Sequence, residues 1–335
     1  MRAASIKDVA NHAGVAVGTV SNVLNYPERV APRTRSRVLA SISTLGFVRN
    51  DVARQLRAGH SRTIGLIVLD IGNPFFSSLA RAAEDAAADS GNAVVLGNSG
   101  HDSHRELHYI DLFEEQRVQG VLISPVADIT QRLTALAERG THVILVDSPA
   151  GEGAFSSVSV DDVSGGYLAT KHLLGLGRRR IAFVAGPQHF HQVRDRLTGT
   201  TRAVGEVVGA TLEVLQADDL TVLAGRAIGD ALVRRERESL PDGLFCANDL
   251  LALGVMQSIT MLHNLRIPED VALVGYDDID FAASAVVALT SIRQPTALIG
   301  QTAVELLAEQ LEDPQTTPRS VVFKPELVVR ASTNG

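Results

Sequence analysis

Residues 6–25 read IKDVANHAGVAVGTVSNVLN and decide how the first part of the chain folds. Ser5 and Asp8 stand at the spacing that caps the start of a helix, and Gly14 would end that helix. A short turn then leads to a second helical repeat. In this repeat the inward residues are Val20, Val23 and Leu24, and the outward residues are Val17, Gly18, Ser21 and Asn22. The spacing predicts a helix-turn-helix, whose second helix enters the major groove of DNA.

The same stretch resembles the headpiece of the lactose-repressor (LacI/GalR-type) family, whose pattern is I-x-D-V-A-x-x-A-G-V-S-x-x-T-V-S-x-V-L-N. The matching residues are Ile6, Asp8, Val9, Ala10, Ala13, Gly14, Val15, Thr19, Val20, Ser21, Val23, Leu24 and Asn25. The alternative is an ordinary pair of helices at the start of an α/β enzyme. The resemblance implies a transcription regulator whose DNA contacts come from Val17, Gly18, Thr19, Ser21, Asn22, Asn25, Arg33, Asn50 and Leu56.

Charge is distributed unevenly along the chain. The net charge is −7, which taken alone argues against a nucleic-acid partner. Residues 1–60, however, carry nine Lys and Arg side chains against three acidic ones, or +6, which leaves −13 on residues 61–335. Basic charge confined to one segment marks the part of a chain that can contact phosphates. We therefore expect DNA to bind only at the N-terminal segment.

The helix-turn-helix headpiece is expected to span residues 1–48. Pro32 suits the first turn of a third helix that would run to about Leu45, where Gly46 would end it. Along this helix, the residues expected to close the core are Val38, Leu39, Ile42 and Leu45. Ala16 and Ala31 stand at N-cap positions where the resembled family often has serine, so the second and third helices should begin without a side-chain cap.

Residues 49–61 are expected to form a hinge helix or a linker. The segment NDVARQLRAGH at 50–60 has a helical pattern but is too short to be stable alone. In the resembled family this segment folds on operator DNA, where two copies pack together and a leucine wedges into the minor groove. Leu56 stands at the matching position. The alternative is a plain interdomain linker.

From Thr63 onward, short apolar runs alternate with helical repeats. This order predicts parallel sheets that are covered by helices on both faces. The expected strands lie at 64–69, 93–98, 121–124, 143–147, 157–160, 181–186, 212–216, 245–248, 271–277 and 321–329. The expected helices lie at 75–90, 103–117, 129–139, 162–176, 193–208, 221–234, 249–264 and 296–312. The fold class is therefore α/β, with two doubly wound parallel-sheet subdomains.

Five motifs in this region resemble the type I periplasmic-binding-protein fold, which the same family carries as its regulatory domain. They are DIGNPFF at 70–76, QRVQG at 116–120, RLTG at 196–199, AND at 247–249 and VGYDD at 274–278. The resemblance implies an effector-binding and dimerisation domain over 62–332, in which the chain crosses three times between two lobes. We expect 62–160 and 291–319 in lobe one, and 161–290 and 320–332 in lobe two.

Polar residues follow several of the predicted strands, where open α/β sheets bind ligands. The resemblance places effector contacts at Phe75, Asp147, Arg196, Asn248 and Asp277. Their chemistry suits a small polyol-like (sugar) or nucleoside-like effector, although each acid alone would also suit a strand-end cap or a surface salt bridge. Sugar-responsive relatives often carry an aromatic residue at the position of Leu220, and this chain has no tryptophan.

Other kinds of site find less support. His104 and His108 lie one helical turn apart, as zinc ligands can, and His101 precedes them, but a solvated helix start explains them better and no metal is expected. No P-loop, no G-x-G-x-x-G after a strand and no G-x-S-x-G elbow occurs, so neither cofactors nor catalytic residues are expected. Cys246, the single cysteine, is interpreted as a buried structural thiol.

The sequence therefore predicts a homodimeric transcription regulator, most simply a repressor, that reads a two-fold-related operator and responds to a small-molecule effector. No apolar run is long enough to span a membrane and the N-terminus lacks the apolar stretch of a signal peptide, so we expect a cytoplasmic protein without a membrane partner. The strongest alternative is a solute-binding protein, which would begin with a signal peptide and lack the helix-turn-helix. A cytoplasmic enzyme is the third candidate.

Overall fold

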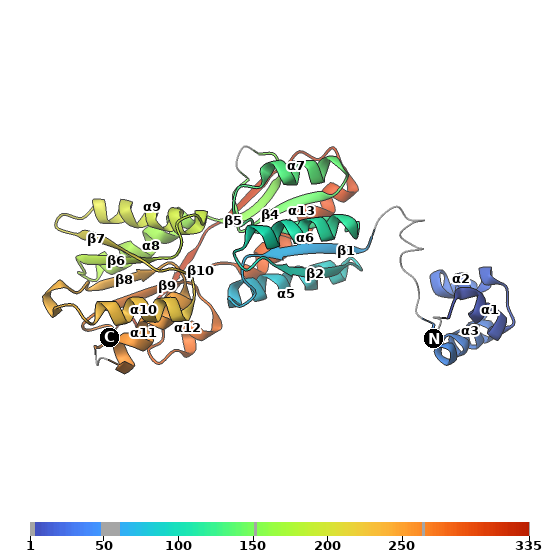
Figure 1. The fold of residues 1–335 in the computed structure, drawn as a ribbon, viewed down its shortest axis with the longest axis horizontal. Helices are drawn as coiled ribbons and strands as arrows, with labels where there is room; N and C mark the ends of the chain where they lie inside the picture. Colours follow the sequence, from blue (N-terminus) through green and yellow to red (C-terminus); the bar gives the residue numbers. More distant parts are fainter. Residues whose placement is uncertain (1–3, 48–60, 151–152, 263–264, 335) are drawn as a thin grey trace. The chain divides into compact units, whose positions relative to one another are not determined.

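The computed structural model describes residues 4–47, 61–150, 153–262 and 265–334. The chain divides into two compact units, one up to Ser61 and the other from Arg62 onward. The first is a small helical headpiece and the second is an α/β core of two lobes (Figure 1). The predicted hinge helix, with Asn50 and Leu56, lies outside the described residues.

Three helices make up the headpiece: α1 (Ile6–Ala13), α2 (Val17–Asn25) and α3 (Pro32–Leu45). A 3-10 turn, Pro27–Arg29, follows α2. The predicted capping box is present at the start of α1, where the Ser5 hydroxyl accepts a hydrogen bond from the backbone N–H of Asp8 and the Asp8 carboxylate accepts one from the N–H of Ser5. Gly14 ends α1 at φ 61°, a left-handed backbone that suits glycine.

The headpiece core is small and apolar. Its fully buried residues are Val9, Ala10, Ala13, Val20, Val23 and Val38. Ile42 and Leu45 pack against them, as the helical spacing predicts. Leu39 was predicted to join this core, but it is 50% exposed. It follows Val38 by one residue and so points about 100° away from the buried stripe of α3.

The two alanine caps give the first testable prediction. Neither Ala16 before α2 nor Ala31 before α3 makes a side-chain capping bond, although both stand at the N-cap position and Ala16 has an extended backbone. A serine hydroxyl there would accept a bond from an unpaired N–H of the first turn. Ala16→Ser and Ala31→Ser should therefore each stabilise the headpiece by about 1 kcal/mol.

Thermal unfolding of a 1–61 fragment, followed by circular dichroism, measures this gain. Ser5→Ala removes an existing cap and should lower the melting temperature. If neither serine variant melts higher than the parent, the N-cap assignments are incorrect.

Lobe one is built on a six-stranded sheet in the order β11-β5-β4-β3-β1-β2, with all neighbours parallel. Its strands are β1 (Thr63–Val68), β2 (Ala93–Asn98), β3 (Gly120–Ile123), β4 (His142–Val146), β5 (Ser156–Val160) and β11 (Ser320–Phe323). Helices α5 (Pro74–Asp89) and α13 (Thr296–Glu312) pack together on one face, and α6 (Ser103–Glu115) and α7 (Thr130–Glu138) cover the other. The predicted doubly wound arrangement is confirmed.

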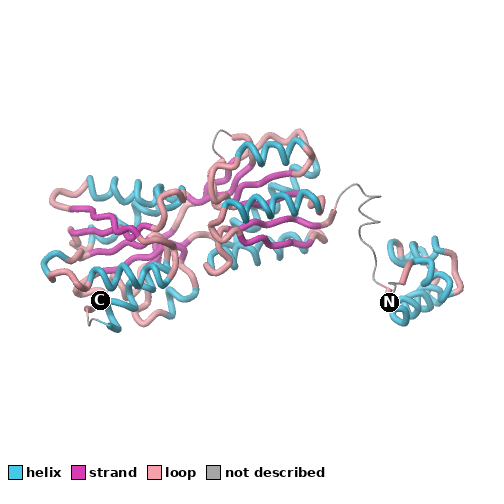
Figure 2. Tube along the Cα trace, in the orientation of Figure 1, coloured by secondary structure: helices cyan, strands magenta, loops and turns pink. Residues whose placement is uncertain are grey.

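Lobe two repeats this plan with the order β12-β10-β9-β8-β6-β7, in which only β12 runs antiparallel to its neighbour. Figure 2 shows the strands of each lobe in magenta with helices in cyan beside them. Its strands are β6 (Arg180–Ala185), β7 (Thr211–Gln216), β8 (Gly243–Cys246), β9 (Ala272–Asp277), β10 (Thr290–Arg293) and β12 (Glu326–Val328). Its helices are α8 (Asp162–Gly175), α9 (His191–Gly205), α10 (Val222–Leu232), α11 (Asp249–Met256), which continues as a π-helical stretch Gln257–Leu262, and α12 (Asp280–Ser284). A 3-10 turn, Arg237–Ser239, precedes β8.

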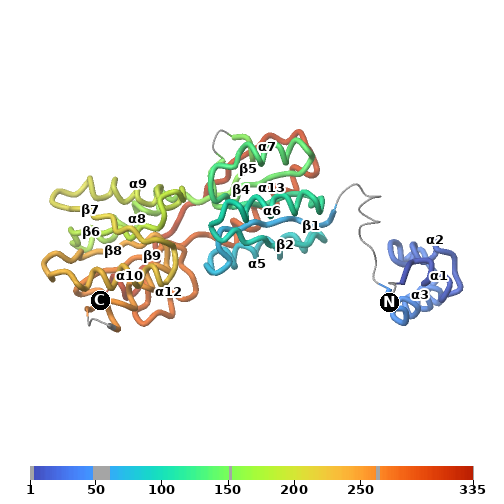
Figure 3. Tube along the Cα trace, in the orientation of Figure 1, coloured from blue at the N-terminus to red at the C-terminus, as the bar shows by residue number. Residues whose placement is uncertain are grey.

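The predicted lobe boundaries at 291 and 320 each misplace one strand, while α13 in lobe one and the segment of β12 in lobe two agree with the prediction. Residues from 291 were assigned to lobe one, but β10 pairs with β9 in lobe two. Residues from 320 were assigned to lobe two, but β11 pairs with β5 in lobe one. The single strand predicted at 321–329 is two strands in different sheets, and Pro325, which cannot donate to a strand ladder, stands between them. Figure 3 shows these orange and red segments running between the lobes.

Two glycines allow α8 and α9 to cross at very short range. A Cβ atom at Gly166 would come within 2.1 Å of the carbonyl oxygen of Arg196, and one at Gly199 within 1.9 Å of that of Val163. Real side chains do not tolerate such distances, so only glycine fits at these positions. The crossing brings Arg196 of α9 next to Asp162 at the start of α8.

Candidate functional site

The surface of α2 carries the residues that were predicted to read DNA. Val17, Gly18, Asn22 and Asn25 are exposed, and Thr19 and Ser21 are half-buried. A Cβ at Gly18 would meet nothing within 4 Å, so the backbone is open to an approaching partner there. The role of these side chains in DNA binding remains a prediction.

Asn25 and Arg33 have different surroundings. The amide of Asn25 donates to the backbone oxygen and to the hydroxyl of Ser21, at 2.8 and 3.2 Å. Asn25 therefore helps to hold the last turn of α2. Arg33 is exposed in the first turn of α3, where a long basic side chain can reach a phosphate.

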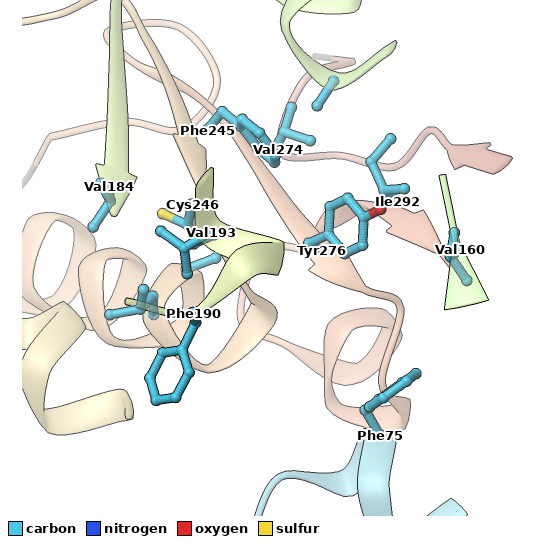
Figure 4. Packing of buried hydrophobic residues seen from close by; sticks show 14 of the residues in the cluster. Phe75, Val160, Val184, Phe190, Val193, Phe245, Cys246, Val274, Tyr276 and Ile292 are labelled. Atoms are coloured by element: carbon cyan, nitrogen blue, oxygen red, sulfur yellow. The ribbon is translucent and has the colours of Figure 1, made fainter. Parts of the chain in front are cut away.

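A pocket lies where the carboxyl ends of the strands in both lobes meet. Its described lining residues are Leu69, Asp70, Asn73, Phe75, Phe76, His101, Asp147, Phe190, Gln192, Val193, Arg196, Leu220, Asn248, Asp277 and Gln294. All five residues predicted to bind an effector, Phe75, Asp147, Arg196, Asn248 and Asp277, are among them. Phe75 and Phe190 belong to the packed cluster drawn in Figure 4. Whether these residues bind an effector stays a prediction, but they form one site.

Hydrogen bonds cross from one lobe to the other inside this pocket. Asn73 of lobe one donates its amide to Oδ2 of Asp277 in lobe two at 3.2 Å. Gln192 of lobe two donates to Oδ2 and to the backbone oxygen of Asp147 in lobe one, at 2.8 and 3.1 Å. Gln294, at the crossing after β10, donates to Oδ1 of Asp277 at 2.8 Å. The lobes therefore contact each other through groups that a ligand could also bind.

Arg196 is buried, and two of its nitrogens have hydrogen-bond partners within lobe two. Its Nε lies 2.8 Å from Oδ1 of Asp162 and its Nη1 donates to the backbone oxygen of Ala247 at 2.6 Å. The guanidinium also lies over the ring of Tyr276, 3.6 Å from the centroid. Burial disfavours the charged form, but the neighbouring acids, Asp162 above all, outweigh it and raise the pKa of Arg196. Its positive charge is already matched by a carboxylate.

Asp147 and Asp277, two of the aspartates that line the pocket, are held in an environment that favours their protonated form. Burial raises the pKa of Asp147 to about 8, and the carboxylate of Asp162 adds to the effect. Burial likewise raises the pKa of Asp277 to about 6, against the opposing charge of Arg196. Oδ1 of Asp147 is buried without a hydrogen-bond partner among the described residues. A protonated carboxyl at this point can donate a hydrogen bond as well as accept one.

Both aspartates have an unusual backbone. The φ angle is 52° at Asp147 and 102° at Asp277, and the next residue, Asp278, is at 54°. Non-glycine residues rarely adopt these values, and such strain concentrates at binding sites. Asp278 is anchored by Arg293 at 2.7 Å and by Arg330 at 2.6 Å. These ion pairs hold the strained turn that directs Asp277 into the pocket.

Sequence reasoning missed the amides and rings that complete the site. Asn73 was included in the DIGNPFF motif but was not predicted as a site residue. Its side-chain oxygen caps α5 by accepting a hydrogen bond from the N–H of Phe75 at 3.0 Å. Asn248 was predicted at the end of a strand, but it caps α11 by accepting from Leu251 N at 2.9 Å and donates to Leu220 O at 3.0 Å. Gln192 and Phe190 lie at the start of α9, and no residue pattern indicated that they face the pocket.

Other candidate features have simpler structural roles. His104 and His108 are exposed on α6, and no group of three metal-ligating side chains occurs in the described ranges. Cys246 is buried, and its desolvation raises the pKa of the thiol, as expected for a structural cysteine. No helix in the part of the chain that the structure describes is long and apolar enough to cross a membrane.

Known proteins match both units. A model of bacterial regulatory proteins of the lacI family matches residues 5–50, and a model of a periplasmic binding protein-like domain matches 170–333. The HTH-type transcriptional repressor PurR of Aliivibrio fischeri is 34% identical over 338 residues, covering 99% of this chain and 98% of that protein. The lac repressor dimer bound to operator and the anti-inducer ONPF is 28% identical with a TM-score of 0.84, covering 100% of both chains. The CelR–cellobiose complex is 31% identical with a TM-score of 0.72, covering 98% of this chain and 99% of that one.

A helix-turn-helix headpiece joined to a two-lobed α/β core defines a DNA-binding transcriptional regulator, not an enzyme. The chain belongs to the lacI family of bacterial regulatory proteins. It is a transcriptional repressor of that family, as its full-length relatives are. The resemblance inferred from the headpiece and core motifs is confirmed.

The raised pKa of Asp147 should make the stability of the folded protein depend on pH. With its pKa raised from 3.8 to about 8, Asp147 keeps a proton in the folded chain that the unfolded chain releases near pH 4. The folded state binds more protons across this window, so stability falls as pH rises from about 4 to about 8. Asp147→Asn imitates the protonated form. It should match the parent at about pH 3.5, below the unfolded pKa, and exceed it at pH 8.5 by at least about 1 kcal/mol, the equivalent of one pKa unit.

Urea unfolding of the full chain at both pH values measures the difference. Asp280→Asn, which changes an exposed acid of α12, serves as the control and should show no such pH dependence. Equal stability of Asp147→Asn and the parent at pH 8.5 would show that folding does not raise the pKa of Asp147.

Proposed function

We propose that the cleft binds an uncharged, hydroxyl-bearing small molecule, such as a sugar or a nucleoside, and that this effector controls the affinity of the repressor for its operator. The proposed contacts are Phe75, Asp147, Arg196, Asn248 and Asp277. The observation that carries the proposal is the convergence of carboxyl and amide groups from both lobes at one pocket. Hydroxyl groups both donate and accept hydrogen bonds, so they match this mixture of groups.

The charge of the pocket favours an uncharged effector. Arg196 is the only arginine or lysine among the described lining residues, and its charge is matched by Asp162 at 2.8 Å. A phosphate group bound here would find no free cation among the described lining residues to balance its own charge. Phe75 and Phe190 line the pocket, so their rings form an apolar part of its wall for a sugar or base.

Two similar structures are described with small-molecule ligands. The regulator CelR is described in complex with cellobiose, and the lac repressor dimer is described with operator and an anti-inducer. These likenesses support an effector in the cleft and a homodimer that presents two α2 helices to a two-fold-related operator. An effector that binds one arrangement of the lobes more tightly shifts the population toward it, which is how it would alter operator affinity.

The effector class is tested with purified full-length protein and a defined panel. Ribose, cellobiose, adenosine and guanosine should be compared with ribose 5-phosphate and adenosine 5′-monophosphate in a thermal-shift assay. At least one uncharged compound should raise the melting temperature, and its phosphorylated counterpart should raise it less. A rise with phosphorylated compounds alone would contradict the proposal.

The link between cleft and operator is tested with Asp277→Asn. This substitution keeps the shape of the side chain but disturbs the bonds to Asn73 and Gln294. Effector response should be lost, while operator affinity without effector stays within about threefold, because no base or phosphate contact is changed. Arg196→Ala is less informative, since it would leave Asp162 buried and unpaired at a cost of about 3–5 kcal/mol.

We would measure operator affinity by fluorescence anisotropy at fixed salt, with and without the compound from the panel. Asp280→Asn is the matched control, because it removes an exposed carboxylate three residues away. A full effector response in Asp277→Asn would exclude this side chain from the coupling.

Base reading by α2 is tested at Asn22. Its exposed amide can form the bidentate pair with adenine that is typical of asparagine, worth about 1–3 kcal/mol of discrimination. Asn22→Ala should therefore change the ranking of single-base variants of an operator selected from random DNA. Asn11→Ala, which removes an exposed amide from α1, should leave that ranking unchanged. Identical rankings for Asn22→Ala and the parent would show that Asn22 does not read a base.

A further inference from the structure

Two side chains from opposite lobes meet at the rim of the cleft. His101 follows β2, an edge strand of lobe one, and Asp219 follows β7, an edge strand of lobe two. Nδ1 of His101 lies 3.5 Å from Oδ1 of Asp219. The two side chains are 20% and 49% exposed, so the contact lies where the pocket opens to solvent. The Asn73–Asp277 contact, in comparison, is buried.

Local structure directs both side chains toward this contact. His101 has a left-handed backbone, with φ 61°, and its N–H donates to the carbonyl oxygen of Leu69 at 3.2 Å. Its ring lies 4.7 Å from the ring of Phe190 in the other lobe. Oδ1 of Asp219 accepts from the N–H of Leu220 at 2.7 Å. A non-glycine residue in this backbone region is uncommon, so His101 is held in place by its surroundings.

The pocket next to the His101–Asp219 contact is too small to admit a sugar-sized molecule without a movement of the lobes. The cavity measures about 40 Å³, which corresponds to roughly three water molecules. A sugar-sized molecule therefore enters only when the lobes separate at the rim. Because His101 lines the pocket and touches Asp219, such a separation breaks the contact between them.

We propose that His101 and Asp219 form a clasp that closes the cleft behind the effector and slows its release, an inference that rests on the proposed function of the cleft. The clasp differs from the inner contacts between the lobes. Asp277 and Asp147 are groups that an effector would engage, whereas Asp219 is not one of the described pocket-lining residues. The contact between His101 and Asp219 can therefore persist while Asp147 and Asp277 form hydrogen bonds with the ligand.

The chemistry of the clasp follows from the charges around the ring. Burial lowers the pKa of His101, although Asp219 and Asp70 act in the opposite direction and His189 adds to the lowering. The guanidinium of Arg105 lies beside the neighbouring Gly100. These surroundings favour the neutral ring, whose Nδ1 makes a polar contact with the carboxylate. Glutamine can supply the same kind of donor.

The clasp is tested first without any ligand, by hydrogen–deuterium exchange of the full chain. His101→Ala and Asp219→Ala should each speed exchange in the segments 97–102 and 186–193 by about three- to tenfold, the effect of losing one polar contact between the lobes. The double variant should exchange no faster than the more affected single variant, since both remove the same contact. His101→Gln should restore slow exchange.

Two matched controls separate the clasp from general loosening of the lobes. His104→Ala and Asp218→Ala change exposed neighbours and should leave exchange in both segments as in the parent. Additive effects in the double variant would assign the change to lost packing of His101 on Phe190 instead of to the pair. Unchanged exchange in His101→Ala would refute the clasp, whatever ligands bind.

The second measurement uses the uncharged compound from the panel above that raises the melting temperature most. Its dissociation rate, measured by stopped-flow dilution, should rise about three- to tenfold in His101→Ala and in Asp219→Ala, and should return toward the parent value in His101→Gln. An unchanged dissociation rate in both alanine variants overturns the retention role. If no compound binds the parent, the proposed effector class is wrong, while the exchange result still decides whether the clasp exists.

Discussion

The buried guanidinium of Arg196 is the interaction on which the cleft depends. It joins the start of α8 through Asp162, the end of β8 through Ala247 and the end of β9 through Tyr276. It can do so only because the glycines at 166 and 199 let two helices cross at backbone distance. A charge withdrawn from water in this way costs several kcal/mol unless its partners are well placed. Each partner is therefore fixed by the others, and the floor of the cleft in lobe two is rigid before any ligand arrives.

The other side of the pocket is held differently. Asp147 and Asp277 accept bonds from Gln192, Asn73 and Gln294, and these amides come from the opposite lobe or from the crossing between the lobes. An amide that gives up its bond to one of these carboxyl groups loses little free energy, because a ligand hydroxyl can accept a hydrogen bond from it instead. The lobes are thus connected by bonds that a ligand can take over, next to a guanidinium that it cannot displace. This combination lets a small molecule influence the spacing of the lobes without disrupting either of them.

Most elements of the fold could be predicted because apolar strands and amphipathic helices leave periodic patterns in the sequence. The five predicted effector residues gather in one pocket because parallel strands bring their carboxyl ends to the same edge. The lobe assignment of β10 and β11 could not be predicted, because a short apolar strand carries no mark of its partner. Asn73 and Gln294 were not predicted as site residues for a related reason. An amide at a helix cap or at a crossing between lobes has an ordinary local role in the sequence, and only the folded structure shows that it also contacts Asp277.

The pairing of β11 with β5 has a consequence for how the protein is made. These neighbouring strands are separated by about 160 residues of sequence, and the whole of lobe two apart from β12 lies between them. A ribosome therefore releases β5 long before the strand that covers its edge exists. At roughly 5–20 residues per second, that edge stays open for about ten to thirty seconds of synthesis. An unpaired strand edge invites association with other chains, so the nascent repressor passes through an interval in which it depends on chaperones or on dilution.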